Sequence, residues 1–338
     1  MSSPITIKDI AKALNISAST VSRALKDHPD ISRETKDAVN NLATKLRYKP
    51  NAVALSLKNS KTNTIGVIIP EVVHFFFSSV ISGIEDVAYD AGYNVMVCQS
   101  NERYAREIIN AQALSSNRVE GVLVSLSKET HDFTHLQNLE ENGIPLVFFD
   151  RAPEELEVDK VIIDDQKAAY NATTHLIETG CKRIAHLAAP QTLGIGIKRL
   201  AGYRQALEEH GIPYKPEWVV IADSFELAGD AARNLMHLPI PPDAIFAVND
   251  MTAVGVMKTL QRMSVQVPQK VAIIGFSAGF FSDITTPTLS SVDQHGYEMG
   301  VEAAKLLLQR IAKPAEGNYK THFIDTHLVL RESTKRKN

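Results

Sequence analysis

Short apolar runs alternate with longer amphipathic stretches from Thr64 almost to the end of the chain. Amphipathic stretches with helical spacing fill most of the gaps, and strands that alternate with helices form parallel sheets covered by those helices. The runs predict buried strands at Ile65–Ile69, Val95–Cys98, Gly121–Ser125, Leu146–Phe149, Lys160–Ile163, Ile184–Leu187, Val219–Ile221, Ala244–Val248 and Val271–Gly275. The predicted helices include Phe77–Ala91, Lys167–Thr179, Arg199–His210, Met251–Met263 and Tyr297–Ala312.

The number of these strands limits how they can be arranged. About ten strands are too many for one compact open sheet with helices on both faces, and a chain of 338 residues exceeds one small core. We therefore expect two doubly wound α/β subdomains. In such sheets ligands bind beyond the carboxyl ends of the strands.

The first 61 residues differ from this body in charge. They contain 11 Lys and Arg against 5 Asp and Glu, a formal charge of +6, so the rest of the chain carries −9 to give the total of −3. A basic block on an acidic body suggests that the block contacts a polyanion and that the body does not.

The pattern inside the basic block predicts three short helices. Thr6 and Asp9 have the spacing of a capping box, and Ser17 can cap a second helix whose Val21 and Leu25 turn inward. A third helix opens at Asp30-Ile31-Ser32, with Val39, Leu42 and Leu46 as its inner stripe. Three helices with a tight turn between the first two describe a helix-turn-helix domain, although a generic three-helix domain fits the same periodicity.

The second helix leaves small and polar residues on its outer face: Ala18, Ser19, Ser22 and Arg23. Small residues let a helix approach the major groove, hydroxyls bond phosphates or base edges, and an arginine can bind guanine in a bidentate manner. This face therefore predicts a DNA-reading helix.

The segment TIKDIAKALNISASTVSRALKDHPDISRETKDAV resembles the DNA-binding head of the lactose- and purine-repressor (LacI/GalR) family. The resemblance continues through YKPNAVALSLKNSKTNTIGVIIP and then covers essentially the whole chain, because the body resembles the periplasmic-binding-protein-like core of the same family. It implies a helix-turn-helix head at 1–49 and a hinge at 50–62. It also implies one core subdomain at 63–163 with 294–322 and another at 164–293 with 323–338.

In that family the hinge becomes helical in the minor groove, where a leucine wedges between central base pairs. By position, Leu57 matches the leucine, Ala54 the close helix contact and Asn51 the start of the hinge. Leu57 could instead be a buried packing residue. The segment NAVALSLKNSKTN is too polar and too short to form a hydrophobic core, however, which favours insertion of Leu57 between base pairs. The DNA-binding residues implied by resemblance and pattern are Thr6, Ser17, Ala18, Ser19, Ser22, Arg23, Asn51, Ala54 and Leu57.

Polar and aromatic residues follow several predicted strands and should meet at one cleft. The motif KRLAGYRQAL matches the family's effector-binding arginine, VFFDR its aspartate and VND its asparagine. The resemblance thus implies an effector site, with Asp250 as a weaker candidate and core packing as the alternative for each aromatic. The expected effector-binding residues are Phe76, Asp150, Arg199, Phe225, Asn249 and Ser277.

Two departures from the family pattern bear on the effector. Gly275-Phe276-Ser277 stands where relatives have Gly-Tyr-Asp, and Leu193 and Ile195 stand where relatives often have polar residues. Losing a carboxylate and two polar groups leaves fewer partners for the hydroxyls of a simple monosaccharide. A larger or less polar ligand fits equally well.

The stretch GFSAG at 275–279 raises a different possibility, because G-x-S-x-G after a strand marks the nucleophile elbow of serine hydrolases. An elbow should launch a long helix, but Pro287 and the β-prone TLSSV follow it. The later Asp293 and His295 lie within one short stretch with no loop between them. We therefore expect Ser277 to lie over the effector site and the protein not to be an enzyme.

The remaining features exclude several other classes. Cys98 and Cys181 lie far apart in apolar settings, as reduced core thiols of a cytoplasmic protein do, and the 11 histidines show no local metal-binding spacing. No signal peptide, membrane span or cofactor motif is evident. The sequence therefore predicts a cytoplasmic, effector-responsive regulator that binds a pseudo-palindromic DNA operator as a homodimer. A solute-binding protein is the alternative, since the body alone resembles one.

Overall fold

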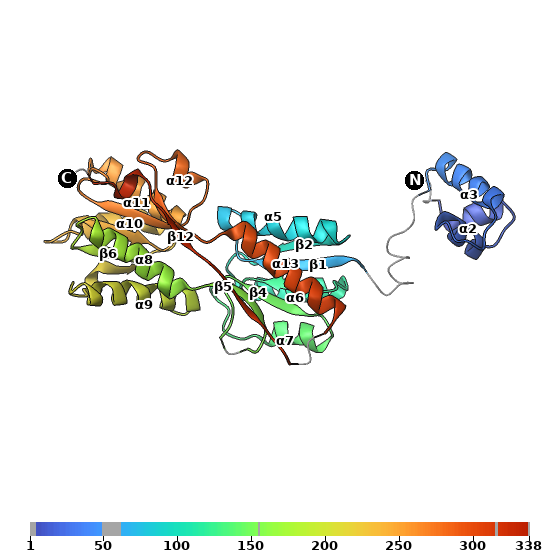
Figure 1. The fold of residues 1–338 in the computed structure, drawn as a ribbon, viewed down its shortest axis with the longest axis horizontal. Helices are drawn as coiled ribbons and strands as arrows, with labels where there is room; N and C mark the ends of the chain where they lie inside the picture. The colour runs from blue at the N-terminus through green and yellow to red at the C-terminus, as the bar shows by residue number, and fades with distance from the viewer. Residues whose placement is uncertain (1–4, 49–61, 155, 315–316, 337–338) are drawn as a thin grey trace. The chain divides into compact units, whose positions relative to one another are not determined.

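The structure is a computed structural model that describes residues 5–48, 62–154, 156–314 and 317–336. The chain divides into two compact units, Met1–Thr62 and Asn63–Asn338, which are called the head and the core below (Figure 1). Asn51, Ala54 and Leu57, the expected hinge residues, lie outside the described residues.

Three helices form the head: α1 (Ile7–Ala13), α2 (Ala18–Leu25) and α3 (Arg33–Lys45). Thr6 and Asp9 form the expected capping box at α1, and the Ser17 hydroxyl accepts the Thr20 N–H at the start of α2. Each cap satisfies backbone donors that the first helical turn leaves free. Asn15 takes the left-handed conformation (φ 53°) in the turn between α1 and α2.

The head has a small hydrophobic centre of its own, where its three helices meet. Its buried members are Ile10, Ala11, Val21, Ala24, Val39 and Ala43. Of the stripe expected on α3, Val39 is buried, whereas Leu42 and Leu46 are only half-buried and pack at the edge. A 44-residue described unit has too little volume to enclose more than a few side chains, so its larger leucines stay at the rim.

The core contains two six-stranded sheets. The first has the order β11-β5-β4-β3-β1-β2, and all its strands pair in parallel. Its strands are β1 (Thr64–Ile69), β2 (Asn94–Gln99), β3 (Val122–Val124), β4 (Leu146–Phe149), β5 (Asp159–Ile163) and β11 (Thr321–Ile324). Helices α5 (Phe75–Asp90) and α13 (Gly296–Ala312) pack together beside it, and α6 (Tyr104–Ser116) and α7 (Thr134–Glu141) form a second layer.

The second sheet has the order β12-β10-β9-β8-β6-β7 and is parallel except for the edge strand β12. Its strands are β6 (Ile184–Ala188), β7 (Val219–Ile221), β8 (Ala244–Ala247), β9 (Ala272–Ser277), β10 (Ser290–Asp293) and β12 (His327–Val329). Its paired helices are α8 (Asp165–Glu178) with α9 (Gly194–Glu209) and α10 (Phe225–Met236) with α11 (Asp250–Arg262). The short elements α12 (Phe281–Ile284), η1 (Pro216–Trp218) and η2 (Glu332–Thr334) complete this half.

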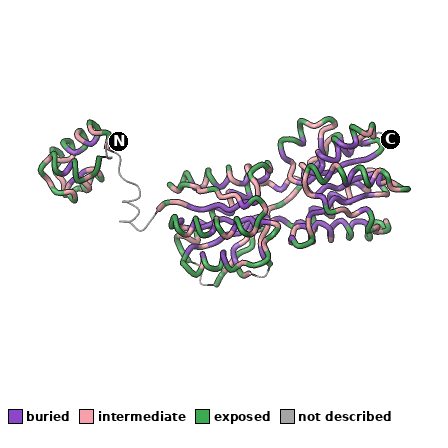
Figure 2. The backbone as a smooth tube through the Cα atoms, turned by 180° about the vertical axis from the view of Figure 1, so that it is seen from behind, coloured by how far each residue is buried: buried purple, intermediate pink, exposed green. Residues whose placement is uncertain are grey.

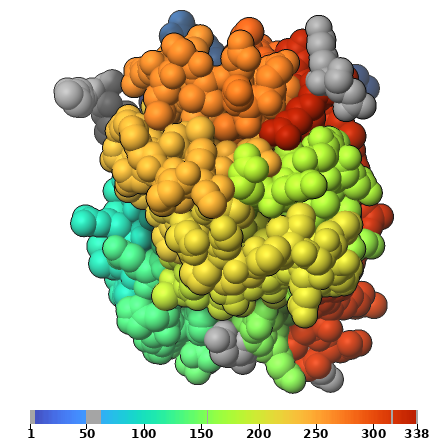
Figure 3. All heavy atoms as spheres, turned by 90° about the vertical axis from the view of Figure 1, so that its left-hand side faces the viewer, coloured from blue at the N-terminus to red at the C-terminus, as the bar shows by residue number. Residues whose placement is uncertain are grey.

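Burial follows this layered arrangement. The central strands are buried along nearly their whole length, whereas the helices alternate between buried and exposed residues (Figure 2). At the end of the core seen in Figure 3, the yellow and gold segments that include α9 and α10 face the viewer. None of the described helices combines the length and the apolar character needed to span a bilayer.

The chain passes between the two sheets at three described places. They lie between β5 and α8, between β10 and α13, and between β11 and β12 (Figure 1). Both sheets also repeat one strand pattern, with the second strand of each half at one edge and the first strand inside it. The chain therefore folds twice in the same doubly wound way, which confirms the expected fold class.

Candidate functional site

A cleft lies where the two sheets face each other with the carboxyl ends of their strands. In doubly wound sheets the crevice forms at the switch point of the strand order, here between β1 and β3 and between β6 and β8. Residues that follow strands of both halves line this cleft: His74, Phe76, Phe77, Glu102, Lys128, Asp150, Arg151, Ala189, Leu193, Ile195, Arg199, Asp223, Val248, Asn249, Ser277 and Gln294.

The structure brings five of the six expected effector residues together at this cleft. They are Phe76, Asp150, Arg199, Asn249 and Ser277. Phe225 instead begins α10, is 38% exposed, and is not among the residues that line the cleft. The chain between β7 and α10 places Asp223 at the cleft in its stead.

Arg199 is held in place by the second half of the core. Its Nε donates to Asp165 Oδ1 at 2.7 Å and its Nη1 to the carbonyl of Val248 at 2.7 Å. Its guanidinium carbon lies 3.6 Å from the centre of the Phe276 ring. Arg199 is thus a fixed cation at the floor of the cleft, and it also neutralises the buried Asp165 carboxylate.

Asp150 is a buried carboxyl at the end of β4, with the backbone in the left-handed region (φ 58°). Burial raises the pKa of Asp150 to about 6, although the nearby guanidinium groups of Arg151 and Arg199 lower it. Non-glycine residues with positive φ persist where the surrounding structure holds them, often at functional sites. Ser277 (φ 119°) and Glu102 (φ 60°) share this feature at the ends of other strands.

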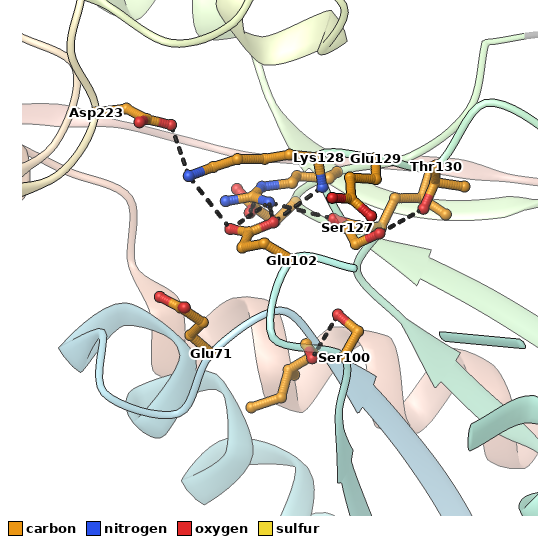
Figure 4. Close-up of polar contacts among 12 residues, drawn as sticks. Glu71, Ser100, Glu102, Ser127, Lys128, Glu129, Thr130 and Asp223 are labelled. Atoms are coloured by element: carbon orange, nitrogen blue, oxygen red, sulfur yellow. Dashed lines mark hydrogen bonds and ion pairs between the residues drawn. The ribbon is translucent and has the colours of Figure 1, made fainter. Parts of the chain in front are cut away.

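A chain of ion pairs crosses the cleft (Figure 4). Arg151 Nη1 donates to both oxygens of Glu102, at 3.0 and 2.8 Å, and Lys128 Nζ lies 3.7 Å from the same carboxylate. Lys128 Nζ also reaches Asp223 Oδ2 at 2.7 Å. Since Lys128 follows β3 and Asp223 follows β7, this contact joins the two halves of the core.

Two buried donors in the cleft make no hydrogen bond of ordinary length among the described residues, although both lie beside the Asp150 carboxyl. They are Arg151 Nε and Gln294 Nε2. Gln294 is 2% exposed, and its Oε1 accepts the Ser277 hydroxyl at 2.9 Å, while its amide group also helps to lower the pKa of Asp150 by hydrogen bonding. A buried donor with only a long or weak contact is incompletely satisfied, so a ligand that carries oxygen acceptors would be stabilised here.

Asn249 and Asp250 have separate roles after β8. The Asn249 side chain caps α11 by accepting the Thr252 N–H and also donates to the carbonyl of Asp223. Asp250 accepts hydrogen bonds from the hydroxyls of Ser291 and Ser282 and from the N–H of Gly279. Asp250 therefore ties β8 to the loop after β9, and it lines only a small cavity beside the cleft, together with Phe76, Asn249 and Ser277.

The space available at the cleft is divided. The cavity among the charged residues measures about 70 Å³, whereas an adjoining cavity of about 560 Å³ shares Asp150, Arg151, Leu193 and Ile195 with it. Small-molecule sites usually measure about 300–1,000 Å³. Leu193 and Ile195, the two apolar residues that depart from the family pattern, thus lie between a small polar cavity and a larger one.

Sequence reasoning missed Glu102, Lys128, Asp223 and Gln294. Each lies one to a few residues beyond a strand end, the rule that identified Asp150 and Asn249. Glu102, Lys128 and Asp223 would have been found by taking the first charged residue after β2, β3 and β7. Gln294 follows β10, a strand that no apolar run marks.

The hydroxyl of Ser277 has no histidine partner in the described residues, since it donates to Gln294. Only the four-residue helix α12 follows β9, where a nucleophile elbow would launch a long one.

Only some of the residues expected to contact DNA are exposed on the surface of the head. Ser19 and Arg23 are exposed, Ser22 is half-buried, and Ala18 is half-buried because it packs against the head core. The hydroxyls of Thr6 and Ser17 are already engaged in the caps of α1 and α2. Ser19 and Arg23 are the described candidates on α2 that are exposed, although the Ser19 hydroxyl also hydrogen-bonds to that of Ser17 at 2.7 Å.

Known protein families match both units of the chain. The family of bacterial regulatory proteins of the lacI type matches residues 6–51. The family of periplasmic binding proteins and the sugar binding domain of LacI regulators matches residues 62–330.

Individual relatives match along nearly the whole chain. The transcriptional repressor PurR of Vibrio campbellii is 32% identical over 335 residues, which is 98% of this chain and 99% of the relative. A complex of the transcriptional regulator CelR with cellobiose has a TM-score of 0.74 at 29% identity, over 97% of this chain and 99% of the other. The lac repressor dimer bound to operator and the anti-inducer ONPF shares the fold, with a TM-score of 0.86 at 23% identity over 98% and 99% of the chains. The chain therefore belongs to the LacI family of bacterial regulatory proteins, and it is a ligand-responsive, DNA-binding transcriptional regulator.

Proposed function

We propose that the protein is a repressor that binds a pseudo-palindromic operator as a homodimer, and that a small molecule in the core cleft changes its affinity for DNA. The cleft is bordered by both sheets, so a ligand there alters the relation between the two halves of the core. The relatives support this reading, because PurR is a repressor and the lac repressor structure is a dimer on its operator. A regulator of this kind acts in the cytoplasm, where the DNA is.

The proposal extends to the DNA contacts. Arg23 and Ser19 would read base edges in the major groove, with Ser22 and Ala18 beside them. Thr6 and Ser17, whose hydroxyls cap helices, would contribute their helix starts to phosphate binding. Leu57 would wedge into the minor groove, with Asn51 and Ala54 forming the rest of the hinge.

The effector that best fits the cleft is a neutral compound with several hydroxyl groups. The observation that supports this most directly is the pair of buried donors, Arg151 Nε and Gln294 Nε2, that make no hydrogen bond of ordinary length. The cleft also holds three carboxylates and three Lys or Arg cations, so it has little net charge with which to attract an ion. Hydroxyls can accept from these two donors and donate to the carboxylates, while Phe76 and Phe77 offer apolar contact.

The effector should have more than one ring. The polar cavity of about 70 Å³ is well below the range of about 300–1,000 Å³ of ordinary small-molecule sites, whereas the adjoining 560 Å³ cavity is large enough for a further ring. Leu193 and Ile195 lie between the two and would contact an apolar ring face. An oligosaccharide meets these conditions, and the cellobiose complex of CelR provides a precedent.

Catalysis is not part of the proposal. The Ser277 hydroxyl donates to Gln294, and a nucleophile would need a base in that place. We therefore expect no ester hydrolysis by the purified protein and no change on Ser277→Ala. A solute-binding protein, the alternative for the core alone, would have no use for a head that matches a DNA-binding family.

A thermal-shift screen of monosaccharides, oligosaccharides and nucleosides tests the effector class. At about 100 times its Kd, a ligand should stabilise the parent protein by about 2.7 kcal/mol. Gln294→Leu removes one of these donors at nearly constant size, so it should lose about 1–3 kcal/mol of ligand binding. Gln309→Leu, the same change on the exposed face of α13, should bind as the parent does. Stabilisation by anionic metabolites alone, undiminished in Gln294→Leu, would contradict the proposed effector class.

A further inference from the structure

Three side chains that commonly bind metals lie together on the segments that connect the two sheets. Asp293 ends β10, His295 is the N-cap of α13, and His327 begins β12. One ligand atom from each lies within 4.8 Å of the other two. These three residues are called the crossover cluster below.

The local fold explains why the cluster forms. Asp293 and His327 are directly paired across the antiparallel strands β10 and β12, which places their side chains on one face. His295 is two residues beyond Asp293, and the N–H of His295 donates to Asp293 Oδ1 at 2.8 Å. Gln294, between them, turns the other way into the effector cleft. No local motif marked the cluster, because His327 is 32 residues from His295.

The two imidazoles are close enough to share one ion. His295 Nε2 lies 2.9 Å from His327 Nδ1, and the ring centres are 4.8 Å apart. His295 Nδ1 lies 3.7 Å from Glu298 Oε2, on the side away from His327. A histidine that binds a metal through one nitrogen usually has a carboxylate at the other, so Glu298 has the position of that second partner.

We propose that the crossover cluster binds one divalent transition metal of the zinc class. Two imidazoles and one carboxylate are ligands that zinc accepts, with water in the fourth position. In a tetrahedral site with bonds of about 2.0–2.1 Å, ligand atoms lie about 3.3 Å apart. The histidine pair is already near this spacing. The Asp293 side chain, 30% exposed, and His327, 55% exposed, have room to make up the remaining difference by side-chain rotation.

A metal here would bridge two of the three connections between the sheets. His295 leads into α13, which packs beside the first sheet, whereas Asp293 and His327 belong to the second sheet. An ion bound to all three fixes the geometry of both connections at once. The adjacent Gln294 links this site to the effector cleft, whatever the effector is.

Metal binding is tested with the full-length protein, using Co²⁺ as a spectroscopic probe and Zn²⁺ in calorimetry. The parent should bind one ion per protomer, with visible Co²⁺ absorption that Zn²⁺ removes. His327→Ala and His295→Asn should each weaken binding at least about tenfold, since loss of even an outer partner of a metal site costs about 10–100-fold. Asparagine suits position 295 because it tolerates the left-handed backbone (φ 51°) found there. Binding should also weaken in acid, because protons compete for imidazole.

The matched control is His237→Gln, which changes an exposed histidine at the end of α10. It should bind metal as the parent does. Hydrogen exchange should slow at 293–296 and 324–327 when Zn²⁺ is added to the parent, and it should not change in His327→Ala. Absence of stoichiometric binding in the parent, or equal loss in His237→Gln, would overturn the site. Binding without protection of both segments would overturn the bridge.

Discussion

Individual residues at the strand ends combine burial, charge and unusual backbone geometry. Glu102, Asp150 and Ser277 all have positive φ, and the two carboxylates lie at the cleft beside Arg151. Each feature costs free energy in the folded protein, so together they indicate a site kept for binding. The consequences can be measured one residue at a time.

Asp150 should make stability depend on pH. Its folded pKa of about 6 lies above the ordinary value of 3.8, so its favourable contribution is complete below about pH 3.8 and is lost as the pH rises through about 6. Asp150→Asn avoids this loss. It should therefore be more stable than the parent at pH 8, by up to about 3 kcal/mol, and the gain should disappear towards pH 4.

Chemical unfolding at a series of pH values measures this gain. Asp90→Asn, at an exposed carboxylate on α5, is the control and should differ from the parent by a constant amount between pH 5 and 8. A gain in Asp150→Asn that does not vary with pH would show that burial of the charge is not its cause.

Arg23 is the second residue whose role can be isolated, because it is exposed on α2. Arg23→Ala should cost about 1–3 kcal/mol on the cognate operator and relax specificity at one base pair per half-site. Arg33→Ala, at an exposed position of α3, should weaken binding to all sequences alike, as loss of a phosphate contact does. Competition binding over operator variants distinguishes the two patterns. Unchanged selectivity in Arg23→Ala would mean that another element reads the bases.

At the scale of elements, the contact between Lys128 and Asp223 connects the loop after β3 to the loop after β7. The side chains are 28% and 10% exposed, so water screens their attraction only in part. A double-mutant cycle with Lys128→Met and Asp223→Asn should give a coupling energy of about 1 kcal/mol in chemical unfolding.

The control cycle uses Lys198 and Glu154, a pair at 2.7 Å that also joins the two halves but is 41% and 67% exposed. Its coupling should be smaller, because exposed pairs contribute little. Equal coupling in the two cycles would contradict a special role for Lys128 in holding the cleft.

The elements also show what could be predicted from the sequence. Strands β1 to β9 were predicted to within two residues at each end, because each coincides with a short apolar run, whether it is a buried central strand or an edge strand such as β2 and β7. Strand β10 overlaps the β-prone TLSSV, whereas β11 and β12 were missed, since they are edge strands with alternating exposure and polar residues. Helix α9 begins at Gly194, five residues earlier than expected. The start was missed because glycine disfavours helices, yet at Gly196 a side chain would meet the carbonyl of Pro190 at 2.5 Å.

The residues of the site also differ in how far they could be predicted from the sequence. Residues next to apolar runs, such as Asp150 and Asn249, could be located from sequence because the run fixes where the strand ends. The Lys128–Asp223 contact and the crossover cluster could not, because they join segments that are distant in sequence and meet only after both sheets have formed. Periodicity describes a segment and its faces, whereas pairing between loops depends on the tertiary arrangement.

At the scale of the whole molecule, charge and function are divided between the two units. The formal charge of +6 lies in the first 61 residues, whereas the ligand cleft lies in a core that carries net negative charge. DNA affinity therefore resides in the head, and control resides in the core. Coupling between two such sites usually amounts to about 1–3 kcal/mol, or about 5–150-fold in affinity.

The most direct test of this account is an operator titration with the full-length protein, with and without the ligand identified by thermal shift. The operator is first selected from random DNA at fixed salt, since affinity for DNA depends on salt. Saturating ligand should change the parent's operator Kd by about 5–150-fold. In Gln294→Leu the same ligand concentration should have a much smaller effect, although operator binding without ligand equals that of the parent. An operator Kd that is the same with and without a ligand shown by calorimetry to occupy the cleft would contradict the account.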